Sequence, residues 1–145
     1  MIKPIVGDLS ILKKKCALVS KDEDITQIIQ DLEDTLATKK GYGMGANQIG
    51  YDKQISIIRV HDWKLDLINP VIIAKEDKVV FPKEGCLSFP GLLLDTDRYN
   101  SIVIETGFEP DRKRYYHIGL EAIVLQHEID HLMGITFFQR KHKGK

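Results

Sequence analysis

The sequence predicts an α+β fold in which antiparallel sheets pack around a central helix near the C-terminus, with one further helix near the N-terminus. Apolar residues follow a helical period in two segments, residues 24–40 and about residues 120–133. Between these segments, runs rich in β-branched and aromatic residues indicate strands. The strands follow one another instead of alternating with helices, and this order favours an α+β fold with mainly antiparallel sheets.

The N-terminal helix is expected to span residues 24–40. Its apolar side chains follow the i, i+3, i+4, i+7, i+11 pattern of one buried face: Ile25, Ile28, Ile29, Leu32 and Leu36. Asp24 is the expected N-cap, with Gln27 at the capping-box position. Two lysines suit the negative end of the helix dipole, and Gly41 suits the C′ position.

The middle of the chain is expected to be mainly strands. The segment GYGMGANQIG, residues 41–50, is too rich in glycine for a helix or a regular strand. Strands are expected in five runs: residues 54–60, 67–73, 78–81, 101–106 and 113–118. The polar sequence HDWKLD separates the first two, and GFEPD joins the last two into a hairpin. The C-terminal helix then runs from about Leu120 to Met133, with Gly134 at its end.

The composition is that of one globular domain, which we expect to span residues 1–145. Hydrophobic residues make up 43% and charged residues 29% of the chain, which is long enough to bury a core. The 21 basic and 21 acidic residues give a formal net charge of zero, so we expect neither DNA nor a membrane as a partner. The chain lacks the apolar core of a signal peptide and any run long enough to span a membrane. We therefore expect a cytoplasmic protein, and a monomer.

The C-terminal helix contains the sequence HEIDH, residues 127–131. On a helix, His127 and His131 lie one turn apart, so both can reach a single metal ion. Glu128 lies about 100° around the helix, where a carboxylate can take a proton from water without being a ligand. The alternative is a core helix with two satisfied histidines. The acid beside them argues against it, because buried ionisable groups need partners.

A catalytic ion of this kind usually takes three protein ligands. No acid follows Asp130, and His142 lies in a basic tail that we expect to be frayed. The third ligand is therefore expected upstream, and Cys86 in the segment KEGCLSFPG is the candidate. A thiolate with two imidazoles suits zinc or ferrous iron. The alternative for Cys86 is an ordinary core thiol, which is the interpretation we give to Cys16.

Three segments together resemble the peptide deformylase family. They are GYGMGANQ at residues 41–48, EGCLS at residues 84–88 and QHEIDHL at residues 126–132, in the order and spacing that family members show. The resemblance implies an enzyme that removes the N-formyl group from the starting methionine of new polypeptides. It also implies one divalent ion, with ferrous iron as the native metal and zinc, nickel or cobalt as other occupants. Only a short basic segment follows the helix, so the sequence does not decide whether the protein contacts the ribosome. It also leaves an organelle or a phage-infected host cell as an alternative location.

The resemblance further implies roles for individual residues. Glu128 is expected to accept the proton of water and pass it to the leaving amine. The Gln48 amide and the Leu87 backbone N–H are expected to stabilise the oxyanion, and the backbone of Gly43 to bind the substrate chain. The methionine side chain needs an apolar pocket, for which core packing is the alternative interpretation; the candidates are Tyr42, Met44, Ile123 and Val124.

Around the ligands, the resemblance implies that Glu84 pairs with Arg98 and so fixes the turn that presents Cys86. Asp130 or Ser88 is expected to orient a metal ligand.

Three positions depart from the family pattern. Gly45 stands where alanine is usual, Asn47 where proline or threonine is usual, and Leu93 where many bacterial members have arginine. The first two lie beside Gln48 and are expected to loosen it, and the third removes a contact to the substrate.

Two other functions remain open at this point. One is a different metallohydrolase, such as a peptidase or amidase. The other is an inactive relative with a bound metal, although a structural ion normally has a fourth protein ligand. His61, His117 and His142 are the candidates for that fourth ligand.

Overall fold

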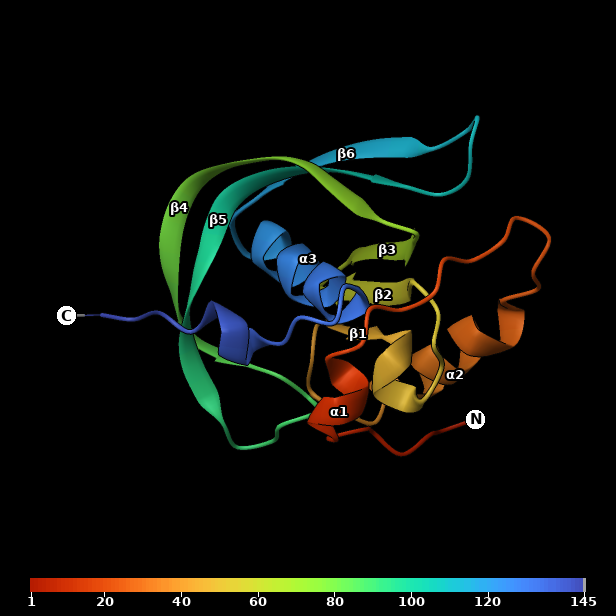
Figure 1. The fold of residues 1–145 in the computed structure, drawn as a ribbon, viewed down its shortest axis with the longest axis horizontal. Coiled ribbons are helices and arrows are strands. Elements are labelled where there is room, and N and C mark those ends of the chain that lie inside the picture. The colour runs from red at the N-terminus through yellow and green to blue at the C-terminus, as the bar shows by residue number, and fades with distance from the viewer. Residues whose placement is uncertain (145) are drawn as a thin grey trace.

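Helix α3 (Gly119–Leu132) lies between two three-stranded antiparallel sheets (Figure 1). The structure is a computed structural model and describes residues 1–144. The first sheet has the order β1 (Gly43–Gly45), β2 (Ile55–Val60) and β3 (Trp63–Ile68). The second has the order β4 (Val71–Gly85), β5 (Leu93–Thr106) and β6 (Lys113–Ile118). The predicted α+β fold with antiparallel sheets around a central helix is confirmed.

Helix α3 is buried without a break from Ala122 to Leu132. One core cluster joins it to both sheets: Ile58, Val60, Leu67, Ile102, Ile104, Ala122, Val124, Leu125 and Ile129. Because every face of the helix is buried, its polar side chains must find partners inside the protein. Within the described residues, no helix combines the length and the apolar character needed to cross a membrane.

Gly134 ends α3 as predicted. It takes a left-handed φ of 77°, and the Ile135 N–H donates to the Asp130 carbonyl at 2.8 Å, which is the bonding of a Schellman cap. The N-terminal segment packs against this end, where the Cys16 N–H donates to the Leu132 carbonyl at 2.9 Å. Cys16 is the buried core thiol that the sequence predicts, and burial raises its pKa to about 11.

Helix α2 (Thr26–Leu36) is shorter than predicted at both ends. The predicted capping box is wrong, because Ile25 is the N-cap and the Gln27 amide donates to Asp31 one turn further on. Asp24 instead accepts a hydrogen bond from the Thr26 N–H at 3.0 Å. At the other end, Thr38 bonds the carbonyl of Thr35 through both its N–H and its hydroxyl, and this competes with a further α-helical turn.

The glycine-rich segment 41–50 forms more regular structure than predicted. Strand β1 pairs with β2 in the register Met44↔Ile57, and the 3-10 helix η1 (Ala46–Ile49) follows it. Pairing with a buried strand outweighs the low strand propensity of glycine here.

The predicted strand at residues 67–73 is wrong, because the chain turns inside it. Pro70 has no N–H to continue a ladder, and Asn69 takes a φ of 50°. One strand therefore ends at Ile68 and the next begins at Val71.

Strands β4 and β5 are much longer than the predicted runs at 78–81 and 101–106. They pair from Val71↔Glu105 to Gly85↔Leu93, so the hairpin places Cys86 directly after β4. The sequence gives little sign of this length, since β4 is mostly exposed and lacks an alternating apolar pattern. The predicted hairpin of residues 101–106 and 113–118 is confirmed as the pairing of β5 with β6.

The segment after α3 packs against β5, so the predicted frayed tail is wrong within the described residues. The 3-10 helix η2 (Phe137–Arg140) is followed by His142, whose N–H donates to the Asp95 carbonyl at 2.8 Å. Its ring Nδ1 lies 2.6 Å from the Asp97 carboxylate. The short helix α1 (Leu9–Leu12) is also absent from the sequence prediction. Lys145 lies outside the described residues.

We expect Gly134→Ala to destabilise the protein much more than Gly50→Ala. Both glycines have positive φ, so each alanine incurs backbone strain of about 1 kcal/mol. At Gly134 the new Cβ would also lie 2.5 Å from the Lys13 carbonyl oxygen, whereas at Gly50 it would meet nothing within 4 Å. Overpacking adds about 1–3 kcal/mol at the first site only. Denaturant unfolding of both variants measures the difference, and equal losses would contradict the close approach at Gly134.

Candidate metal centre

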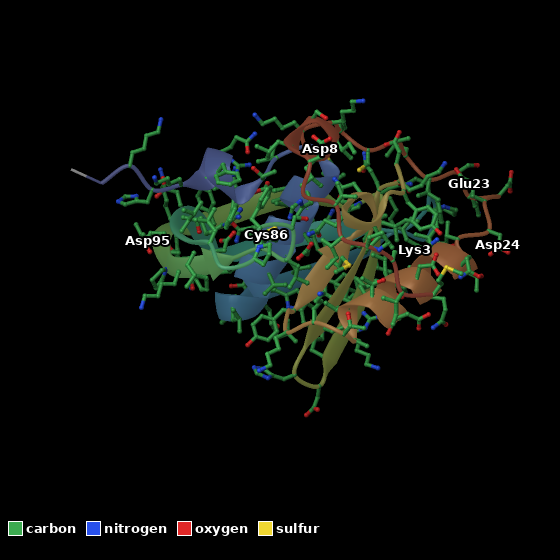
Figure 2. The ribbon with its side chains drawn as sticks, turned by 90° about the horizontal axis from the view of Figure 1, so that it is seen from below. Lys3, Asp8, Glu23, Asp24, Cys86 and Asp95 are labelled. Carbon is green, nitrogen blue, oxygen red and sulfur yellow. The ribbon has the colours of Figure 1, made fainter. Side chains whose placement is uncertain are left out.

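Cys86, His127 and His131 come together from two parts of the chain. Cys86 follows β4, and the two histidines lie one turn apart on α3. The Cys86 Sγ is 3.3 Å from the His131 Nε2, which is 3.2 Å from the His127 Nε2. All three donor atoms lie within 4.8 Å of one another. Figure 2 shows Cys86 near the middle of one face, with Asp95 toward one end of the molecule and Glu23 toward the other.

Two of the three donor–donor distances are close to those expected around a tetrahedral ion. Metal–nitrogen bonds of about 2.0–2.1 Å and a metal–sulfur bond of about 2.3 Å place such donors about 3.3–3.6 Å apart. The two distances above are close to this range. Three protein donors also leave a fourth position for water or substrate, as in catalytic sites.

The two histidines differ in their electrostatic surroundings. Burial lowers the pKa of His127, but its contacts with Cys86 and Glu84 outweigh burial and raise the pKa to about 10. Burial and the neighbouring charge of His127 hold the pKa of His131 well below its usual value. Two charged rings this close would repel each other, and this is why the charge on His127 lowers the pKa of His131.

Glu84 connects the metal centre to a buried ion network. Its Oε2 accepts a hydrogen bond from the His127 Nδ1 at 2.6 Å and another from the Arg98 Nη2 at 2.7 Å. Its Oε1 accepts from the Arg98 Nε at 2.9 Å and from the Thr96 hydroxyl at 2.7 Å. Burial raises the pKa of Glu84, and these partners together hold it well below its usual value. The predicted pairing of Glu84 with Arg98 is confirmed.

The prediction that Asp130 or Ser88 orients a metal ligand is wrong. Asp130 accepts hydrogen bonds from Arg98 at 2.6 Å and from Arg140 at 2.9 and 3.0 Å. The Ser88 hydroxyl accepts from the Gln48 amide at 3.0 Å. Glu84 has the orienting position instead. The sequence shows an acid two residues before the candidate cysteine, but not its bond to a histidine 43 residues away.

Glu128 faces the cavity with a buried carboxyl group. Its side chain lies against Gly43, where a Cβ would come within 2.9 Å of the Glu128 Cγ. Among the described residues, its Oε1 has no hydrogen-bond partner. Burial, opposed by the charge on His127, raises the pKa of Glu128 to about 7. A carboxyl group with this pKa can both take and give a proton near neutral pH.

Gln48 is held by both ends of its side-chain amide. The Oε1 accepts from the Gly45 N–H at 2.9 Å, and the Nε2 donates to Ser88 and lies 3.9 Å from the Cys86 Sγ. The N–H end of the amide is thus directed toward the metal centre. Leu87 follows Cys86 and lines the same cavity.

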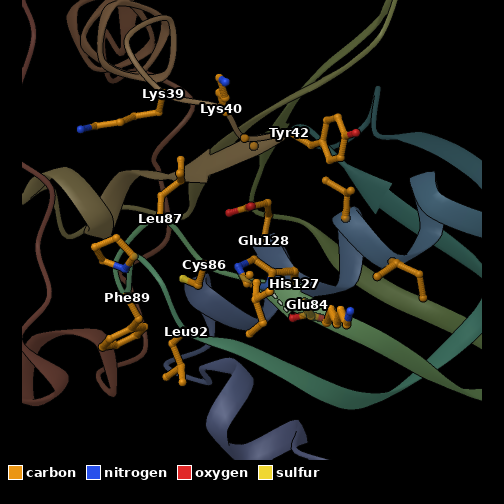
Figure 3. Close-up of a pocket in the computed structure, with 18 of the residues that line it drawn as sticks. Lys39, Lys40, Tyr42, Glu84, Cys86, Leu87, Phe89, Leu92, His127 and Glu128 are labelled. Carbon is orange, nitrogen blue, oxygen red and sulfur yellow. Dashed lines mark hydrogen bonds and ion pairs between the residues drawn. The ribbon is translucent and has the colours of Figure 1, made fainter.

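Cys86 and His127 of the candidate metal centre line a cavity of about 680 Å³ (Figure 3). The walls come from residues 39–43, residues 81–93 and one side of α3. Of the residues predicted to contact substrate, four line this cavity: Tyr42, Gly43, Ile123 and Val124. Met44 does not line it, because its side chain is fully buried in a second core cluster with Leu32 and Ile55. The structure therefore favours Tyr42 of the two residues predicted opposite α3.

The model of the polypeptide deformylase family matches residues 2–145. The chain belongs to this family. It is therefore a metal-dependent hydrolase that removes the N-formyl group from nascent polypeptides, and the fold and motif order agree with that activity.

Individual relatives support the assignment over most of their length. The peptide deformylase of Karelsulcia muelleri is 39% identical, over 94% of this chain and 77% of the relative. That of Aquifex aeolicus is 39% identical, over 90% of this chain and 81% of the relative. The crystal structure of the Thermotoga maritima peptide deformylase superposes with a TM-score of 0.90 at 28% identity and covers 99% of both chains. The enzyme of the Vibrio parahaemolyticus bacteriophage VP16T, solved with actinonin, gives 0.85 at 35% identity, over 93% of this chain and 99% of the phage enzyme.

We expect Arg98→Ala to destabilise this deformylase far more than Arg140→Ala, although both arginines bind Asp130. Removing Arg98 leaves the buried Glu84 without its arginine and leaves Asp130 with only the partly exposed Arg140, a change that costs about 3–5 kcal/mol. The Arg140 side chain is 38% exposed, so its loss should cost about 0–1 kcal/mol. Chemical denaturation and metal content, measured on both variants, report the difference. Unchanged stability and metal content in Arg98→Ala would contradict a supporting role for the network.

Proposed function

We propose that Cys86, His127 and His131 hold one divalent metal ion, natively ferrous iron, with zinc, nickel or cobalt as other occupants. The convergence of one sulfur and two ring nitrogens within 4.8 Å is the observation that carries this proposal. Thiolate and imidazole donors suit both iron and zinc. The preference for ferrous iron rests on the family resemblance. The hydrogen bond from His127 to Glu84 supports the ligand role, because metal-bound histidines usually donate their other ring N–H to an acceptor.

When bound, such an ion polarises a carbonyl and lowers the pKa of a coordinated water toward about 7. We propose that Glu128 accepts a proton from the water that attacks the formyl carbon. The same carboxyl group then passes the proton to the methionine nitrogen as the carbon–nitrogen bond breaks. The products are formate and a peptide with a free amino group. The raised pKa of Glu128 supports both halves of this transfer.

We propose that Gln48 and Leu87 stabilise the oxyanion that forms when the water adds. The Gln48 Nε2 donates to the Ser88 hydroxyl in the structure and can turn its second N–H to the substrate oxygen. The backbone N–H of Leu87 supplies the other donor. One donor of this kind is worth about 3 kcal/mol in the transition state.

The peptide substrate is proposed to extend along β1. This strand pairs with β2 on one side and forms the edge of its sheet, so the backbone of Gly43 can bond an added strand. The methionine side chain would then lie against Tyr42, Ile123 and Val124. Further along the cavity, Leu93 is 58% exposed, and we propose that it contacts apolar side chains downstream of the methionine.

We propose that residues 1–145 act as one monomeric catalytic domain in the compartment where its substrates are made. That compartment is the cytoplasm of the cell or of a phage-infected host, or the interior of an organelle. Contact with the ribosome is part of the proposal. The basic segment after η2 offers Lys141 and Lys143 for it, whereas Arg140 and His142 already pair with acids of the protein.

Formate release is the direct test of the proposed reaction. We expect protein prepared anaerobically with ferrous iron to release formate from formyl-Met peptides. Chelation should abolish the activity, and ferrous iron should restore it more fully than zinc. An acetyl-Met peptide serves as the control, because one extra methyl group reduces the rate about 10- to 200-fold in a tight site. Internal cleavage of the peptide without formate would favour a peptidase instead.

We expect Glu128→Gln to keep the metal and lose the activity. The amide has the shape of the carboxyl group but cannot accept the proton, so formate release should fall about 10²- to 10⁴-fold. The measurement pairs the rate at saturating peptide with the metal content of the same sample. A fully active variant would show that another group moves the proton.

A further inference from the structure

Asn47 ties the loop that carries Gln48 to the helix that carries His131. Its Nδ2 donates to the backbone carbonyl of His131 at 2.8 Å, and the bond is fully buried although the residues are 84 apart in sequence. The His131 carbonyl lies in the last turn of α3, where helix carbonyls lack a full set of intrahelical partners. The Gly134 N–H also donates to it, at 3.1 Å. Asn47 therefore holds α3 at the position of a proposed metal ligand.

Gly45 provides the space that Asn47 occupies. A Cβ at residue 45 would lie 3.1 Å from the Asn47 Oδ1, 3.4 Å from the Leu132 Cδ2 and 3.6 Å from the His131 Cβ. The backbone of Gly45 is extended, with φ −91° and ψ 151°, which any residue can adopt. Glycine is therefore favoured here by the tight approach of the Asn47 Oδ1, whereas the distances to α3 are ordinary van der Waals contacts and the backbone conformation does not demand glycine.

The same short loop also fixes Gln48. The Gly45 N–H bonds the Gln48 Oε1 at 2.9 Å and so directs the Nε2 toward Ser88 and Cys86. Asn47 is 4% exposed, and its Oδ1 has no partner among the described residues. Burying an amide with an unsatisfied oxygen is unfavourable. An apolar side chain would avoid that penalty but could not bond the His131 carbonyl.

We propose that Asn47 is a positioning residue that fixes His131 relative to Gln48, and that Gly45 and Asn47 act as a coupled pair. The inference rests on the proposed roles of His131 and Gln48. It reverses the sequence expectation that the two departures from the family pattern loosen Gln48.

A double-mutant cycle tests this pair, using Gly45→Ala, Asn47→Ala and the double variant. Neither residue lines the cavity, so the KM for a formyl-Met peptide should stay unchanged in all three. In Asn47→Ala we expect kcat to fall and the metal to dissociate faster, each by about fivefold or more. In the wild-type protein, Gly45→Ala should lower kcat at least about fivefold. In the Asn47→Ala variant, the same change should lower kcat much less.

The measurements distinguish a role of Asn47 in positioning His131 from a role only in the stability of the fold. If kcat and metal dissociation of the folded Asn47→Ala protein match the wild type and only its unfolding midpoint falls, the inference is wrong. Equal effects of Gly45→Ala with and without Asn47→Ala would remove the coupling. Should Asn47→Ala fail to fold, Gly45→Ala/Asn47→Thr replaces it, and this variant must recover kcat relative to Gly45→Ala. Wild-type formate release, measured in the same assay, tests the proposed function separately, because metal dissociation and unfolding still report the coupling if that activity is absent.

Discussion

The buried cation of Arg98 is the interaction on which the rest of the site depends. A central helix that is buried on every face cannot carry charged side chains unless each finds a partner. Arg98 extends from β5 and bonds Asp130 of α3 on one side and Glu84 at the end of β4 on the other. One side chain thus fixes the strand that presents Cys86 against the helix that presents both histidines. The Glu84 Oε2 also accepts a hydrogen bond from the His127 Nδ1 and so fixes the orientation of that ring.

The hairpin of β4 and β5 carries two members of the network, Glu84 and Arg98. Residues 84 and 98 lie on neighbouring strands of this hairpin, and both bond residues in the C-terminal half of α3, His127 and Asp130. The strands outside that contact are largely exposed, so their length comes from backbone pairing more than from apolar burial. The segment after α3 closes the other side of the network, where Arg140 bonds Asp130. Three parts of the chain therefore enclose the buried ion network: the hairpin of β4 and β5, helix α3 and the segment after α3.

The sequence predicts the candidate metal ligands better than it predicts the residues that hold those ligands in place. Cys86, His127 and His131 are recognisable because ligand type and helical spacing are local properties. The bond from His127 to Glu84 joins residues 43 apart, and no local pattern reports it. The same holds for Asn47 and His131, and for the contacts of His142 with β5. The failed capping box at Asp24 has a different cause, since Gln27 has a competing partner in Asp31.

The Glu128 Oε1 and the His131 Nδ1 are the two buried side-chain atoms of α3 that have no hydrogen-bond partner among the described residues. Gln126 bonds backbone groups of Tyr99 and Ala122, and Asp130 bonds two arginines, so these polar neighbours on α3 are well satisfied. Glu128 has an oxygen without a partner among the described residues, and burial holds its pKa near 7. A fully bonded carboxylate would be more stable, but its lower pKa would make it a weaker base and so a poorer acceptor of a proton from water. The unfavourable burial of this carboxyl group thus lies where we propose that the proton is exchanged.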